Sequence, residues 1–107
     1  MTDQPGQQYE EEVRTFTGGQ SQIIEGREID SVTEEALIQA KDSETAKNKP
    51  HNFLSKKMRS QIKETIRLAK NLGKRPEFWF KQQPHPDVCR YIEEKEGMII
   101  VWNKETK

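Results

Sequence analysis

The hydrophobic positions of this 107-residue chain are concentrated in its second half. Between Phe53 and Trp102 lie nearly all the large apolar side chains, including six of the eight aromatic residues. A core of that size suits a domain of about 55 residues. The pattern therefore predicts a mostly disordered acidic region over residues 1–50 and a small basic domain over residues 51–107.

The strongest periodic signal predicts one long helix that ends at Gly73, a natural residue for a helix terminus. Asn52 or Ser55 can cap its start, and Pro76 follows where the helix has already ended. Apolar residues recur every three or four positions and form one buried stripe: Leu54, Met58, Ile62, Ile66, Ala69 and Leu72.

Three shorter elements follow this helix. Residues 77–81 alternate as in a strand, and residues 98–102 form a short apolar run, which is the clearest strand signal. Residues 86–97 are typical of a second helix, but an alternative pairs residues 88–93 with 98–103 as a hairpin, and the pattern does not choose. The predicted fold class is α+β, with a long basic amphipathic helix, a short second helix and a two-stranded sheet.

Residues 1–50 carry weaker signals. Residues 1–20 are rich in Gln, Glu and Gly and are interpreted as disordered, and residues 21–29 have too few apolar positions for more than a short strand. Residues 32–41 predict a short helix, because Ser31 and Glu34 have the capping-box spacing and the apolar positions form one stripe. Residues 41–50 are interpreted as a linker.

Charge is distributed unevenly along the chain, although the net charge is zero. Residues 1–50 hold 11 acidic and 5 basic side chains, whereas residues 51–107 hold 7 acidic and 13 basic ones. This asymmetry is typical of an acidic tail on a basic domain. The single cysteine, Cys89, excludes an intramolecular disulfide, so a reducing cytoplasmic setting is expected. No signal peptide or membrane-length apolar run is present, and we expect no membrane partner.

The long helix carries a continuous basic face opposite its apolar stripe. Nine basic residues stand against two acidic ones between positions 56 and 81. Like charges four residues apart weaken a helix, and cations at its amino terminus oppose the macrodipole, so stability does not explain this face. A polyanion partner is favoured over the alternatives, which are a plain solvated face, an acidic protein surface and the chain's own acidic tail. The predicted nucleic-acid-binding residues are Lys56, Arg59, Lys63, Arg67, Lys70 and Lys74, with Trp79 and Lys81 extending the surface.

The stretch LSKKMRSQIKETIRLAKNLGKRP resembles the carboxyl-terminal basic helix of the bacterial small-subunit ribosomal protein S-eighteen family. The resemblance covers residues 54–76 and does not extend to the rest of the chain. It implies contact with ribosomal RNA through the basic face. The matching positions are Leu54, Ser55, Lys57, Ile62, Ile66, Arg67, Ala69, Lys70, Leu72 and Pro76.

No catalytic signature is evident. His85 and Cys89 have a spacing that suits metal binding on a helix, but a structural zinc site normally needs four ligands. A Cys89 nucleophile lacks an activating base other than His85. We therefore predict no catalytic residue, no metal, no cofactor and no small-molecule substrate, so the chain is not expected to be an enzyme.

The sequence favours a small non-catalytic nucleic-acid-binding protein, with RNA preferred over DNA and an association with the ribosome. The alternative is a regulator or inhibitor subunit that docks on an acidic protein surface within a larger complex.

Overall fold

Five strands form one mixed sheet in the order β1-β2-β3-β4-β5. The computed structural model describes residues 5–105. Its helices are α1 (Pro5–Thr17), α2 (Thr45–Asn48), α3 (Pro50–Phe53), α4 (Lys56–Asn71) and α5 (Pro86–Glu94). Its strands are β1 (Gln20–Ile24), β2 (Arg27–Val32), β3 (Ala36–Lys41), β4 (Arg75–Phe80) and β5 (Met98–Val101). In this described range, no helix is both long and apolar enough to cross a membrane.

The two halves of the sheet differ in strand direction. β1, β2 and β3 pair antiparallel, whereas β3, β4 and β5 pair parallel. Parallel neighbours need crossover connections, and α4 and α5 provide them. The carboxyl ends of β3, β4 and β5 therefore meet at one edge of the sheet, where ligands bind in many open α/β sheets.

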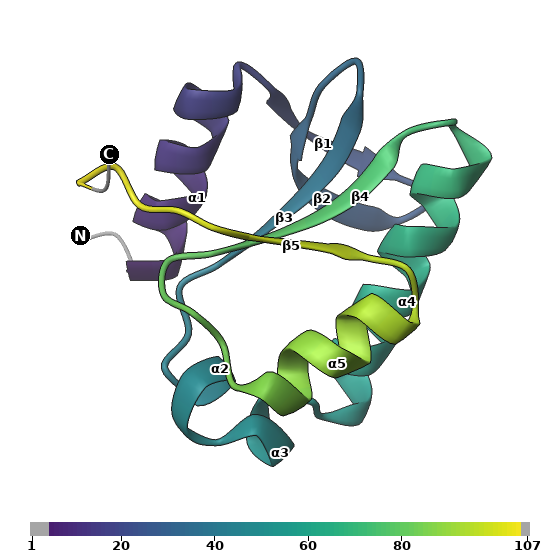
Figure 1. The fold of residues 1–107 in the computed structure, drawn as a ribbon. Coiled ribbons are helices and arrows are strands. Elements are labelled where there is room, and N and C mark those ends of the chain that lie inside the picture. The colour runs from purple at the N-terminus through teal and green to yellow at the C-terminus, as the bar shows by residue number, and fades with distance from the viewer. Residues whose placement is uncertain (1–4, 106–107) are drawn as a thin grey trace.

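Helices cover both faces of the sheet. Figure 1 shows α1 on one side of the strands and α4 with α5 on the other. Tyr9 and Val13 of α1 pack with Ile38 and Trp79, whereas the other face buries α4 and α5 against Phe78 and Phe80. A third cluster joins Leu68 of α4 to Ile29 and Leu37. β3 is thus covered on both faces.

The predicted long helix is confirmed by α4. The Ser55 hydroxyl accepts a hydrogen bond from the Met58 N–H at 3.2 Å, which caps its first turn. Gly73 follows the helix in the left-handed region, at φ 69°. Residues 86–94 form α5, so the helix interpretation is confirmed and the hairpin alternative for residues 88–93 is wrong.

The helix predicted over residues 32–41 is wrong, because residues 36–41 form β3. The stretch from Ala36 to Ala40 is buried throughout. A strand covered on both faces shows a continuous apolar run rather than alternation, and such a run also fits a helix stripe. Ser31 does not cap a helix, since its hydroxyl lies 2.9 Å from Thr17 Oγ1 and is buried under α1.

The predicted disordered amino-terminal region and two-stranded sheet are also wrong. Residues 5–17 form α1, and three of the five strands come from residues 20–41. Few apolar residues are needed here because Tyr9 and Val13 are both fully buried against the rest of the sheet. The Tyr9 hydroxyl donates a hydrogen bond to the Trp102 carbonyl at 2.6 Å, which fixes α1 to the far end of the chain.

Candidate active site

Strands β2 and β3 separate partway along the sheet. Their pairing is limited to Ser31 with Ile38 and Val32 with Leu37. Beyond this point β2 pairs only with β1, and β3 pairs only with β4. Asp30 lies where the strands part, and its Oδ2 accepts a hydrogen bond from the Ala40 N–H at 2.8 Å. The opening thus places a carboxylate in the position that a ladder partner would otherwise fill.

Asp30 is the most buried acidic group of this opening, with a relative exposure of 5%. Burial raises the pKa of its carboxyl group, while the Ala40 hydrogen bond and the charge of Lys41 oppose that rise. Arg14 Nη1 donates to the Asp30 carbonyl at 3.0 Å, so α1 is fastened at the same place. A buried carboxylate with charged neighbours is characteristic of functional sites.

Lys41 is the last residue of β3 and lies on the α4 side of the sheet. Its Nζ donates to Gln61 Oε1 of α4 at 2.5 Å. Burial lowers the pKa of the ammonium group, and the negative charges of Asp30 and Glu10 oppose the shift. Lys41 also lines a hollow of about 220 Å³ at the carboxyl ends of β3 and β4, together with Lys81. The ammonium group is therefore buried close to the carboxylates, while the residue itself borders this edge of the sheet.

Glu10 joins the cluster from α1. Burial raises the pKa of its carboxyl group to about 7, and the negative charges of Asp30 and Glu28 add to the rise. The positive charges of Arg14 and Lys41 oppose it. Two acidic groups and one ammonium group therefore interact at the point where β2 and β3 part, although they come from three separate elements.

Gln39 stands two residues before Lys41, so both side chains lie on the same face of β3. Its Nε2 donates to the Glu28 carbonyl at 3.0 Å and to Thr65 Oγ1 at 3.1 Å. The first bond gives the Glu28 carbonyl of β2 a hydrogen-bond donor at a position where β2 no longer pairs with β3. Both Nε2 protons are thereby used, so only the acceptor oxygen of this amide is left for other contacts.

The donor set of this site fits one class of metal ion. In residues 5–105, no three His, Cys, Asp or Glu side chains are grouped so that they could hold a metal by themselves. Mg²⁺ does not require such a group, because it uses one or two carboxylates and completes its shell with water and substrate phosphates. Asp30 and Glu10 provide two carboxylates at the opening. These residues suit Mg²⁺ and do not suit a structural zinc ion.

We predict that the metal-free protein loses stability as pH rises from about 4.5 through about 7. Glu10 has a pKa of about 7 in the fold against 4.5 as its ordinary value, so ionisation costs more in the folded state. The contribution of the protonated Glu10 carboxyl group to the free energy of unfolding is fully present below pH 4.5 and is lost as the pH passes 7. Thermal melts with a chelator, from pH 4.5 to 8, measure this effect.

The Glu10→Gln variant is expected to flatten that part of the profile and to melt at a higher temperature than the wild type at pH 8. Glu11→Gln, at an exposed position of the same helix, is the matched control and should keep the wild-type profile. A Glu10→Gln profile that falls as steeply as the wild type would contradict the prediction.

The basic face predicted on α4 is divided in two. At the carboxyl-terminal half, Arg67 pairs with Glu64 at 2.8 Å and with Glu25 at 3.3 Å, and Lys70 pairs with Glu96 at 2.6 Å. At the amino-terminal half, Lys56, Arg59 and Lys63 line a hollow of about 540 Å³ with Ser60 and Glu64. Five of the six predicted cations lie on α4, whereas Lys74 follows the end of the helix at Asn71, and only part of the face is open to a partner.

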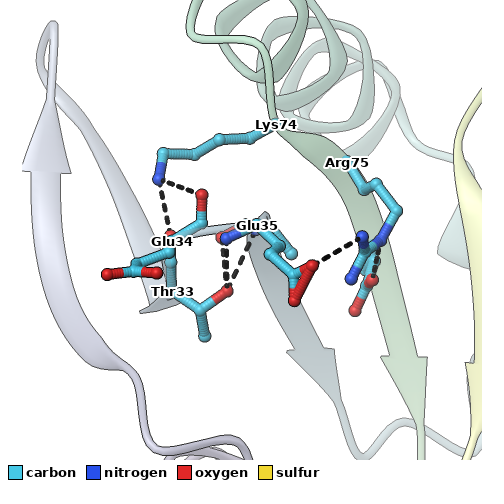
Figure 2. A network of polar contacts seen from close by, with 7 residues as sticks. Thr33, Glu34, Glu35, Lys74 and Arg75 are labelled. Atoms are coloured by element: carbon cyan, nitrogen blue, oxygen red, sulfur yellow. Dashed lines mark hydrogen bonds and ion pairs between the residues drawn. The ribbon is translucent and has the colours of Figure 1, made fainter.

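Lys74 is also engaged within the protein. Figure 2 shows its Nζ reaching the turn before β3, where it donates to the carbonyls of Thr33 at 2.6 Å and Glu34 at 3.0 Å. The neighbouring Arg75 pairs with Glu35 at 3.6 Å, and its Nε bonds Glu77 Oε2 at 2.9 Å. These contacts fasten the turn to the start of β4, at the opposite edge of the sheet from Lys41.

Trp79 and Lys81 occupy different environments. Trp79 is buried against α1, and its Nε1 donates to Glu77 Oε1 at 2.9 Å, so it offers no stacking face to solvent, contrary to expectation. Lys81 lies at the same edge as Lys41, with its Nζ 3.8 Å from Asp42 Oδ2. Lys81 is therefore the only one of the two that is placed to extend a surface toward the site.

His85 and Cys89 serve local structure. His85 is the residue before α5, and its Nδ1 accepts a hydrogen bond from the Asp87 N–H at 3.0 Å. Burial raises the pKa of the Cys89 thiol, which disfavours the reactive thiolate. Sequence reasoning weighed these two residues and missed Glu10, Asp30, Gln39 and Lys41.

The signal that could have found the site is the pair Gln39 and Lys41. Both are polar residues that alternate with apolar ones at the end of a buried run, and Asp30 follows Ile29 in the strand before it. That alternation has meaning only if residues 36–41 form a strand. The assignment of a helix and a linker to this stretch therefore concealed the site.

A comparison with protein-family models matches residues 2–102 to Tox-REase-3, described as restriction endonuclease fold toxin 3. No curated protein and no solved structure matches the chain significantly. The match covers nearly the whole chain and overturns the resemblance to the ribosomal S-eighteen family, which rested on residues 54–76. The predictions of a non-catalytic, ribosome-associated protein and of no enzyme are wrong as well, because this fold is that of a nuclease. A nucleic acid remains as the partner, and the chain belongs to the restriction endonuclease fold toxin 3 family.

Proposed function

We propose that this chain is a nuclease toxin that hydrolyses the phosphodiester bonds of DNA at the opening between β2 and β3. One observation carries the proposal: the buried Asp30, whose Oδ2 accepts from the Ala40 N–H, lies where the two strands part and is near enough to Glu10 and Lys41 for their charges to interact. The family match supports the same reaction class. The site combines carboxylates for a hard cation with an ammonium group for a phosphate.

The carboxylates and the ammonium group have separate roles. Asp30 and Glu10 would hold Mg²⁺, which would polarise the phosphate and make water a better nucleophile. The Lys41 ammonium donates a hydrogen bond to a non-bridging oxygen of the phosphate and offsets the negative charge that develops there. Gln61 and Gln39 orient these groups, because Gln61 accepts from Lys41 and Gln39 bridges β2 to α4.

In the reaction, the oxygen of water forms a bond to phosphorus while one ester bond to phosphorus breaks. The attacking water gives up one proton to solvent and the leaving oxygen of the sugar takes one up from solvent, so the products are a phosphate monoester end and a hydroxyl end. Lys41 remains protonated in this scheme and acts by charge and orientation.

DNA is proposed as the substrate in place of RNA. The preference for RNA rested on the ribosomal resemblance, which the family match replaces. Restriction endonucleases, after which the fold of the family is named, cleave DNA. Docking on an acidic protein surface is not needed to explain a basic surface that adjoins a nuclease site.

The test is cleavage of plasmid DNA by the purified chain in the presence of Mg²⁺. We expect nicked or linear product in Mg²⁺ and at least about a 100-fold lower rate with excess EDTA, since the carboxylates alone do not activate water. Structured RNA of similar length is the parallel substrate. No cleavage of DNA in Mg²⁺, or cleavage that EDTA leaves unchanged, would contradict the proposal.

A further inference from the structure

The cations on α4 and just after its end differ in whether other groups of the protein compensate their charge. We call Arg67, Lys70 and Lys74 the carboxyl-terminal trio; each bonds to one of the turns around the helix. These turns are β1–β2 with Glu25, α5–β5 with Glu96, and β2–β3 with the Thr33 carbonyl. The carboxyl-terminal trio therefore fastens α4 to its surroundings, and the cost of placing like charges together is offset within the fold.

The amino-terminal trio, Lys56, Arg59 and Lys63, is different. All three side chains are exposed, and none forms a hydrogen bond or ion pair with another residue in the described range 5–105. Lys56 and Arg59 lie in the first turn of α4, where the macrodipole disfavours cations. The fold supplies no compensation for them, so an anionic partner from outside best explains their presence.

This amino-terminal trio lies at the active-site end of the sheet. Gln61, which accepts the hydrogen bond from Lys41 at 2.5 Å, stands between Arg59 and Lys63 on the same helix. Ser60, next to Arg59, accepts a hydrogen bond from Arg27 Nη2 of β2 at 3.0 Å. The amino-terminal half of α4 therefore contacts both strands that part at the candidate site.

The dimensions of this surface match a phosphate backbone. Lys56 and Lys63 are seven residues apart on α4, which corresponds to about 10 Å along a helix. The hollow that the amino-terminal trio lines has a volume of about 540 Å³. A row of cations over this length spans about three phosphates of one strand, since a strand of duplex DNA carries one phosphate per about 3.4 Å of helix axis.

The surface around the amino-terminal trio lacks the aromatic side chains that typically bind single-stranded nucleic acids. Proteins that bind single-stranded nucleic acids stack the bases on aromatic side chains. No aromatic side chain lines the hollow of the amino-terminal trio. Phe16, the exposed aromatic residue of α1, belongs to the helix on the other face of the sheet. A surface that has cations but no aromatic side chains recognises only the phosphates of a nucleic acid. This favours a duplex, because the bases of a duplex are already stacked and paired with each other.

We propose that the amino-terminal trio, together with Arg27, binds the phosphate backbone of duplex DNA and delivers one strand to Glu10, Asp30 and Lys41. The inference rests on the proposed nuclease function and names the surface that holds its substrate. The carboxyl-terminal trio is structural and does not contact DNA.

Two triple variants with equal loss of charge test this division. One carries Lys56→Gln, Arg59→Gln and Lys63→Gln, and the other carries Arg67→Gln, Lys70→Gln and Lys74→Gln. Binding to a duplex DNA of about 20 base pairs is measured in EDTA, so that cleavage does not interfere, over a range of salt concentrations.

The amino-terminal triple variant is expected to bind at least about 10-fold more weakly and to lower the slope of log K against log salt by about 2, since each lost phosphate contact removes about 0.9. The carboxyl-terminal triple variant should keep its affinity within about 3-fold and melt at a lower temperature. Equal weakening by both variants, or no weakening by the first, would overturn the inference.

Binding of different nucleic acids to the wild-type protein tests which of them supplies the phosphates. Duplex DNA should bind at least about 5-fold more tightly than single-stranded DNA or duplex RNA of the same length, and tighter binding of either alternative would overturn the assignment. If the proposed nuclease function is wrong but this inference is right, the experiments give a different result. In that case the amino-terminal trio still governs binding in EDTA, but Mg²⁺ produces no cleavage. If cleavage occurs and the amino-terminal triple variant keeps the wild-type KM, the nuclease function stands and this surface is wrong.

Discussion

Replacing Lys41 with methionine is expected to lower the rate of DNA cleavage at least about 100-fold while the domain stays folded. Loss of one group that stabilises charge in the transition state typically costs a factor of about 100 to 1,000. Stability should hold, because burial already disfavours the ammonium group and methionine keeps the apolar part of the side chain. Plasmid cleavage in Mg²⁺ and a thermal melt measure the two effects.

Asp30→Asn separates the role of the carboxylate from that of the ammonium group. Mg²⁺ should raise the Tm of the wild type and of Lys41→Met, because a ligand that binds only the folded state stabilises it. In Asp30→Asn both cleavage and this rise in Tm should be lost. Lys49→Met, at an exposed position, is the matched control and should cleave like the wild type. Wild-type cleavage by Lys41→Met would remove this residue from the mechanism.

Much of the second half of the fold could be predicted, because its elements are encoded locally. α4 has a capping serine, a single apolar stripe and a terminal glycine, and each of these signals lies within the element itself. β5 is a short apolar run bounded by turn residues. In such stretches tertiary contacts reinforce the local preference.

The first half could not be predicted, because its order depends on distant partners. Tyr9 is buried only through its contacts with the sheet and its hydrogen bond to Trp102, 93 positions further along the chain. β3 is flanked by α1 on one face and α4 on the other, so its apolar run fits a helix as well as a strand. Local periodicity carries no information about which elements cover a segment.

The site was hidden for the same reason. Glu10, Asp30 and Lys41 come from a helix and two strands, in a part of the chain that the sequence pattern assigned to a mostly disordered region with a short helix at residues 32–41. They meet only because the β2–β3 ladder ends after two residue pairs. The basic face of α4 was visible from the sequence, but the division of its cations into a paired and an unpaired trio depends on turns far apart in the chain.

Val13→Asp is expected to lower the Tm by at least about 10 °C and to abolish cleavage above the new transition. Val13 is completely buried between α1 and β3, so an aspartate there is a buried charge without a partner. Such a change costs about 3 kcal/mol or more, and each kcal/mol lowers the Tm of a domain of this size by about 4–8 °C. Circular dichroism melts with parallel cleavage assays measure the effect.

Thr15→Asp, two residues further along the same helix, introduces the same side chain at an exposed position and serves as the control. It should melt within a few degrees of the wild type and keep its cleavage activity, since surface changes are usually within about 0.5 kcal/mol. If α1 were disordered, as the sequence pattern indicated, the two variants would behave alike. A difference in Tm between them would show that α1 is part of the core, and the position of Glu10 at the candidate site depends on that packing.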